Sequence, residues 1–194
     1  MTDPATSFVT PSQTVGPFFS YALPYEAGNE IAAADARGAF RLHGRVLDGN
    51  GEPVPDALVE IWQADPDGNL AAESGIYSAP SEFRGFGRSG TDEEGRYWFR
   101  TVKPGPVATA DGRPQAPHLG VTVFARGLLR QLYTRIYFPD EAAANSTDPL
   151  LADLDPTRHH TLVATPDGEG GLVFDIHLQD HEGEKETVFL DVFG

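Results

Sequence analysis

The candidate side chains for chemistry in this chain are its histidines, tyrosines and arginines, and the chain has no cysteine. That absence excludes disulfides, thiolate nucleophiles, Cys-ligated zinc and iron–sulfur clusters. The sequence also contains no Gly-rich phosphate loop, nucleophile elbow or zinc-protease motif. Its six histidines give no set of three ligands by spacing alone. The residue pattern by itself therefore predicts no autonomous metal site.

Two pairs of residues that include histidine have spacings that bear on metal binding. Asp175 and His177 stand two residues apart on a predicted strand and share one face, so they could hold an ion, although we favour a structural or exposed pair. His159 and His160 are adjacent, and on a strand they would point to opposite faces. His43 falls on the polar side of its strand and is interpreted as structural.

Charge narrows the possible partners. The chain has 14 basic and 29 acidic residues and a formal net charge of −15, which opposes binding to nucleic acid and to anionic membranes. An anionic substrate would need a local cation, and Arg126, Arg130 and Arg135 cluster within ten residues. Ion pairing with surface acids is the alternative role for each. His118 and Arg126 share a strand but stand about 26 Å apart, too far to contact one small ligand unless the strand bends.

The elements that must position these residues are mostly short strands. The chain has 194 residues, enough for one domain, and its 21 glycines and 16 prolines predict many turns. Alternating apolar residues predict an all-β fold, an antiparallel β-sandwich of prealbumin-like or immunoglobulin-like type with under about 15% helix. The expected strands cover residues 40–46, 57–63, 96–102, 118–126, 132–138, 161–164, 172–178 and 187–192, with a short helix over 140–145. The expected core contains Val59, Ile61, Trp62, Phe99, Val121, Val123, Ile136 and Phe174.

Two segments lack a regular period. Residues 1–39 are predicted to form an N-terminal arm, and residues 40–194 the sandwich domain. The alternative for the arm is a disordered tail, but we favour an ordered arm laid across a surface, since Val15, Phe18, Phe19 and Tyr21 give it apolar side chains to bury. Residues 69–90 are predicted to form a long loop, and loops of this length in compact domains are usually either functional or disordered. No signal peptide or apolar run of membrane-spanning length is visible, so a cytoplasmic location is expected.

Four segments jointly resemble the intradiol ring-cleaving dioxygenases. They are TPSQTVGPFF at 10–19, IWQADPDG at 61–68, TVKPGP at 101–106 and APHLGVTVFARG at 116–127. The resemblance runs over nearly the whole chain, with the motifs in family order. It implies a sandwich fold and a part in the O2-dependent opening of a catechol ring at a non-haem Fe(III).

The resemblance also implies which positions would hold the iron. Iron-bearing members use two tyrosinates and two histidines, and the matching positions here are Val107, Leu70, His118 and Gly120. An arginine near the first histidine is replaced by Gln115. Three of the four ligand side chains are missing, so the chain is similar to an iron-free alpha subunit. The resemblance therefore implies no catalytic residue and no metal ligand in this chain, with Fe(III) held by a beta chain of the same family.

The remaining site residues come from the same resemblance. Thr14, Gly16 and Pro17 match arm positions that line the substrate pocket, and Arg126 matches an arginine at the substrate carboxylate. Phe18 stands where a tyrosine is common, and His118 is interpreted as a structural remnant. The implied reaction converts protocatechuate and O2 to 3-carboxy-cis,cis-muconate in aromatic catabolism, the beta-ketoadipate pathway, in an alpha–beta hetero-oligomer. The alternative is a non-catalytic β-sandwich binding or scaffold module.

Overall fold

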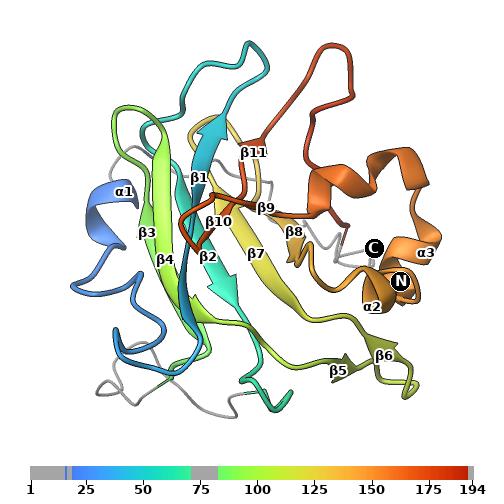
Figure 1. Ribbon diagram of the computed structural model, residues 1–194. Helices are drawn as coiled ribbons and strands as arrows, with labels where there is room; N and C mark the ends of the chain where they lie inside the picture. Colours follow the sequence, from blue (N-terminus) through green and yellow to red (C-terminus); the bar gives the residue numbers. More distant parts are fainter. Residues whose placement is uncertain (1–15, 17–18, 71–82, 192–194) are drawn as a thin grey trace, which may run out of the picture.

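The computed structural model describes residues 16, 19–70 and 83–191, and it consists of two packed β-sheets (Figure 1). In the first sheet, the central strand β1 pairs antiparallel with β4 and parallel with β10 and β11. Its strands are β1 (Ala39–Leu47), β4 (Arg96–Val102), β9 (Thr165–Pro166), β10 (Leu172–Val173) and β11 (Ile176–His177). The predicted β-sandwich is confirmed, and 12% of the described residues are helical.

The second sheet is wholly antiparallel, in the order β3-β2-β7-β8. Its strands are β2 (Leu58–Trp62), β3 (Phe86–Gly90), β7 (His118–Phe124) and β8 (Leu132–Tyr137), and a separate hairpin joins β5 (Val107–Ala108) to β6 (Pro114–Gln115). In the β7–β8 pairing, His118 stands opposite Tyr137 and Gly120 stands opposite Arg135. These four positions share one face of the sheet, because side chains alternate along a strand.

The core forms where the inward faces of both sheets meet, as the alternating pattern predicts. Seven of the eight predicted core residues are buried there, and Trp62 is the exception, with 54% of its surface exposed. The apolar run of β2 suggested burial on both faces. At Trp62, however, the outer face of the sheet is open, and the indole packs only on Phe86, with ring centroids 4.4 Å apart.

The C-terminal third departs from the expected strands. Residues 156–162 form a 3₁₀ helix, which Asp155 caps through the Thr157 amide, instead of a strand starting at 161. The strand expected over 172–178 is divided into β10 and β11, and the last expected strand is reduced to a single bridge between Leu190 and Tyr133. The short helix is confirmed as α2 (Ala142–Asn145), followed by α3 (Pro149–Asp153) on the same side of the sandwich (Figure 1).

A close backbone approach explains the division of this strand. The Phe174 carbonyl oxygen accepts a hydrogen bond from the Tyr97 hydroxyl at 2.6 Å and lies directly over Gly44. A Cβ at position 44 would stand 1.8 Å from that oxygen, so only glycine fits there. The isolated glycine in β1 therefore marks where the C-terminal segment crosses the sheet.

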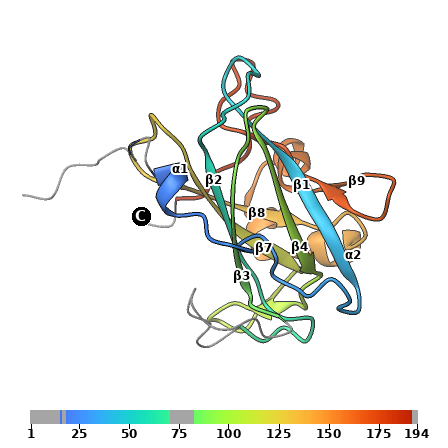
Figure 2. The ribbon, with the colours of Figure 1, turned by 90° about the vertical axis from the view of Figure 1, so that its left-hand side faces the viewer.

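The N-terminal region both packs into the sandwich and projects from it. Ile31 belongs to the core and is 1% exposed, while the Arg100 carbonyl accepts hydrogen bonds from the Ile31 and Ala32 amides. Helix α1 (Phe19–Ala22) lies beside the loop that joins β7 to β8 (Figure 2), where Phe19 packs on Phe124 with ring centroids 5.2 Å apart. The structure also places β3 inside the range 69–90, which was predicted to be a loop throughout.

Candidate functional site

A cavity of about 480 Å³ opens on the outer face of the second sheet, at the His118 end of β7. It is lined by Trp62, Gln63, Ala64, Leu70, Gly85, Val107, Gln115, His118, Gly120 and Arg135. The five positions that the family resemblance assigned to the iron site, residues 70, 107, 115, 118 and 120, all lie in this one wall. Segments up to 50 residues apart therefore meet where the resemblance required them to meet.

Two of the family motifs build one side of the cavity by packing against each other. The Gly105 amide donates to the Asp65 carbonyl at 2.8 Å, which joins the TVKPGP turn to the IWQADPDG turn. A Cβ on Gly105 would stand 2.6 Å from the Gly68 amide nitrogen, so the two turns need glycine for this approach. The chain then runs into the β5–β6 hairpin, in which Val107 pairs with Gln115.

His118 is held in its neutral form. Its Nδ1 lies 2.8 Å from the Ala116 carbonyl oxygen, and since a carbonyl can only accept, Nδ1 carries the proton and Nε2 carries the lone pair. Burial, with a smaller contribution from the nearby Arg135 charge, lowers the pKa of His118 from 6.5 to about 4. The imidazole therefore offers an acceptor at neutral pH and adds no positive charge to the cavity.

A chain of hydrogen bonds connects Arg135 to a buried carboxylate. Its Nη1 donates to the Tyr137 hydroxyl at 3.3 Å, and that hydroxyl donates to Asp148 Oδ1 at 2.9 Å. Asp148 is fully buried, and its other acceptor positions receive the Ala116, Leu150 and Leu151 amides. Burial raises the pKa of Tyr137, so the tyrosine stays a neutral bridge between the two charges.

The lining of the cavity does not fit a ferric ion. Among the described lining residues, Leu70, Val107 and Gly120 carry no donor atoms, and His118 supplies one imidazole. Fe(III) favours anionic oxygen ligands, yet no carboxylate or phenol stands in the described part of this wall. The charged group that is present, the Arg135 guanidinium, has the same sign as a metal ion.

The predicted substrate-contact residues lie elsewhere. Arg126 follows the far end of β7, is 65% exposed at its side chain, and forms an ion pair with Asp56 at 3.1 Å. Gly16 is exposed, and its carbonyl accepts from the Phe19 amide, so this part of the arm lies at the Arg126 end of the strand. The predicted residues Thr14, Pro17 and Phe18 fall outside the described residues. Arg126 does not line the 480 Å³ cavity, which has Arg135 instead.

The other histidines have structural surroundings. Asp175 accepts from the Arg45 amide at 2.8 Å, which supports the structural interpretation of the Asp175–His177 pair, and His43 lies 3.4 Å from Asp167. His159 and His160 stand in the 3₁₀ helix, so the geometry considered for them on a strand does not apply. Within residues 16, 19–70 and 83–191, no group of three or more metal-ligating side chains gathers.

Comparison with known proteins places the chain in a family. Residues 16–179 match the family model described as Dioxygenase, and the chain therefore belongs to this iron-dependent intradiol dioxygenase family. It is 42% identical to the protocatechuate 3,4-dioxygenase alpha chain of Pseudomonas putida, over 94% of this chain and 96% of that one. It is 45% identical to the alpha chain of the same name from Burkholderia cepacia, over 94% of this chain and 97% of that one.

Two further matches widen the comparison. The protocatechuate 3,4-dioxygenase beta chain of Burkholderia cepacia is 39% identical over 64% of this chain and 51% of its own length. Catechol 1,2-dioxygenase from Pseudomonas arvilla C-1 has a similar fold, with a TM-score of 0.58 at 24% identity over 82% of this chain and 58% of that one. In the described part of the chain, no helix is long and apolar enough to cross a membrane.

Arg135 and Asp148 were the residues that sequence reasoning handled least well. Arg135 was considered only as one of three clustered arginines, and Asp148 was not singled out. The Asp-Pro pair at 148–149 carries a local signal, because Asp at the N-cap followed by proline starts a helix. Its hydrogen bond to Tyr137 depends on tertiary packing and has no local signal.

Proposed function

We propose that this chain acts as the iron-free alpha subunit of a protocatechuate 3,4-dioxygenase, paired with a beta chain that holds the Fe(III). The observation that carries the proposal is the cavity at residues 70, 107, 118 and 120. The four positions that the resemblance matches to the iron ligands lie in its wall, and three of them, Leu70, Val107 and Gly120, carry no side-chain donor atom. The full-length similarity to two alpha chains supports the same assignment.

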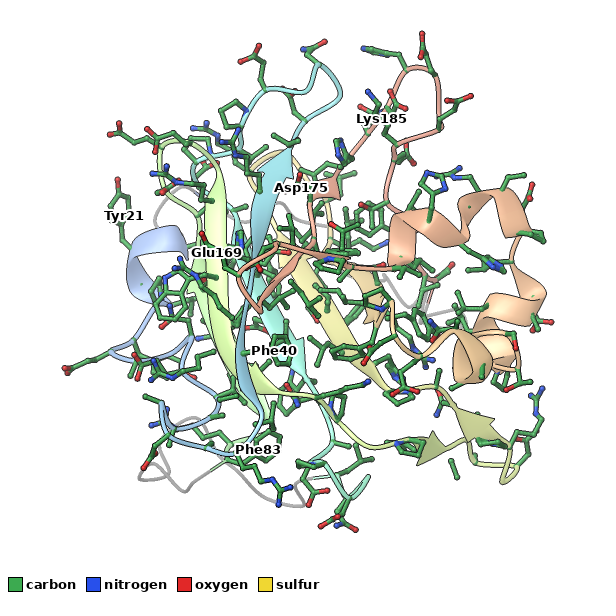
Figure 3. All side chains as sticks on the ribbon, in the orientation of Figure 1. Tyr21, Phe40, Phe83, Glu169, Asp175 and Lys185 are labelled. Carbon is green, nitrogen blue, oxygen red and sulfur yellow. The ribbon has the colours of Figure 1, made fainter. Side chains whose placement is uncertain are left out.

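The surface offered to the partner's active site is the end of the sandwich that carries Gly16 and Arg126. Tyr21 on α1 projects away from the sheets there (Figure 3) and is 84% exposed, an unusual state for a large aromatic side chain. We assign Thr14, Gly16 and Pro17 to the wall of the partner's substrate pocket. Small and rigid arm residues allow close backbone approach to an aromatic ring.

Arg126 is assigned to the carboxylate of protocatechuate. Its present partner is Asp56, whose side chain is 19% exposed, but the Arg126 guanidinium is 65% exposed, so water screens the pair and weakens its contribution to stability. A substrate carboxylate can replace it with two parallel hydrogen bonds to the guanidinium fork. The iron of the beta chain would supply the activation of the catechol for ring opening with O2. This chain's residues would bind and orient the substrate and exclude water.

The test is reconstitution with the beta chain, measured by co-purification and by oxygen uptake with protocatechuate and with catechol. Arg126→Met should raise KM for protocatechuate about 10- to 100-fold and leave catechol nearly unchanged, since only the former has the carboxylate. The KM of Arg126→Lys for protocatechuate should lie between those of the unsubstituted chain and of Arg126→Met. Arg130→Met is the matched control on the same loop. Equal losses on both substrates would remove Arg126 from the substrate site. A chain that never associates with the beta chain would favour the binding-module alternative.

A further inference from the structure

Arg135 is a cation without an anionic partner in the described structure. Among the described residues, its side chain forms a hydrogen bond to the Tyr137 hydroxyl at 3.3 Å, and it is half-buried in the wall of the 480 Å³ cavity. Other arginines of the described chain form ion pairs with carboxylates, namely Arg88, Arg96, Arg100, Arg113 and Arg126. In a chain with a net charge of −15, a guanidinium that faces a cavity rather than an acid is set up to receive an anion.

The rest of the cavity suits a flat apolar body. Trp62, Leu70 and Val107 give it an indole and two aliphatic walls, and Trp62 is exposed although it is large and apolar. Its volume lies in the usual range for small-molecule sites, roughly 300–1,000 Å³, which combine apolar walls with a few converging polar groups. Here those groups are the Arg135 donors, the Gln115 amide and the neutral His118 Nε2 acceptor.

We propose that this cavity is a metal-free binding site for a small aromatic monocarboxylate. The carboxylate meets the Arg135 guanidinium, and the ring lies against Trp62. The cross-strand pairing supports this arrangement, since Arg135 stands opposite Gly120, where the missing side chain leaves room for the ligand. The guanidinium thus supplies fixed positive charge at a place where the donor set cannot hold Fe(III).

Binding in this cavity differs in chemistry from catechol binding to iron. It depends on one carboxylate and needs no vicinal hydroxyl groups, so benzoate should bind and catechol should not. The described residues that line the site all belong to this chain, and the site is separate from the Arg126 surface, at the opposite end of β7. Its occupation does not depend on the proposed partnership with a beta chain.

The probe is 4-fluorobenzoate, titrated into the full chain and followed by ¹⁹F NMR and calorimetry. Saturable binding should weaken at least about 10-fold in Arg135→Met, remain partly in Arg135→Lys, and stay within about 2-fold in the control Arg130→Met, at a residue that does not line the cavity. Gly120→Phe should also abolish binding, because its ring would occupy the space left for the ligand. The variant should still fold, because a Cβ at position 120 would make only an ordinary contact of 3.5 Å with the Trp62 backbone. Thermal melts of each variant confirm that it is folded.

Neutral analogues complete the test. Benzamide and catechol should bind at least about 10-fold more weakly than the fluorobenzoate. No saturable binding up to about 10 mM would overturn the proposal. So would unchanged affinity in Arg135→Met, or equal binding of benzamide. None of these results bears on the alpha-subunit assignment, which is tested by oxygen uptake in the reconstituted pair.

Discussion

Asp148 should be among the residues on which the stability of this fold depends most. Its carboxylate is fully buried and accepts four hydrogen bonds, from the Ala116, Leu150 and Leu151 amides and from the Tyr137 hydroxyl. Asp148→Ala removes an N-cap, which costs about 1 kcal/mol, and leaves a buried amide and a buried hydroxyl unpaired, at about 1–3 kcal/mol each. Because these terms overlap, we expect a loss of about 3–5 kcal/mol in the free energy of unfolding.

The measurement is urea denaturation of the full chain, with the midpoint and the slope fitted separately. Asp155→Ala is the matched control, because Asp155 caps the 3₁₀ helix through Thr157 but is exposed, so its loss should cost about 0.5–1 kcal/mol. The loss of unfolding free energy in Asp148→Asn should lie between those of the two alanine variants, since one acceptor oxygen becomes a donor. Losses within about 1 kcal/mol of each other for the two alanine variants would refute the reasoning.

Three further outcomes are expected. Phe99→Ala should cost about 3–5 kcal/mol in the same denaturation assay, because Phe99 is wholly buried in the core, and a loss below about 1 kcal/mol would contradict its placement. The lowered pKa of His118 means that the unfolded chain binds its proton first as pH falls. The contribution of His118 to the free energy of unfolding is therefore complete above about pH 6.5. It decreases by about 3 kcal/mol as the pH falls from there to about pH 4. His118→Gln should flatten the pH profile of stability by that amount, and parallel profiles would disprove it. Deleting residues 1–18 should leave the midpoint of unfolding unchanged but lower oxygen uptake in the reconstituted pair, and unchanged kinetics would remove the arm from the active site.

The fold was predictable where local alternation reports burial. The strands around Phe99 and Val121 follow that rule in their burial: the apolar residues Tyr97, Phe99, Leu119, Val121 and Val123 alternate along the chain and are buried. Trp62 was assigned to the core because side-chain type does not reveal that the outer face of the sheet is open at that point. The C-terminal segment is divided by the crossing of Phe174 over Gly44, a contact between residues 130 apart.

The site was predictable in part, through the positions of the family motifs. Those positions converge on one cavity, and Leu70, Val107 and Gly120 lack donor atoms there, as the resemblance implied. The role of Arg135 was not predictable, because its distance from His118 is set by the β7–β8 register. That register is fixed by cross-strand packing rather than by a motif. The lowered pKa of His118 depends on the same long-range placement, because it follows from burial and from the nearby Arg135 charge.

The central claim is that this chain holds no iron and works beside a chain that does. Iron content should be measured in the full chain expressed alone in iron-supplemented medium, and in the chain co-expressed with a protocatechuate 3,4-dioxygenase beta chain, with the visible absorption spectrum of each. We expect negligible iron and no visible phenolate-to-iron band in the chain alone. In the complex we expect about one iron per pair of chains, with that band. Stoichiometric iron with a phenolate-to-iron band in the chain alone would contradict it.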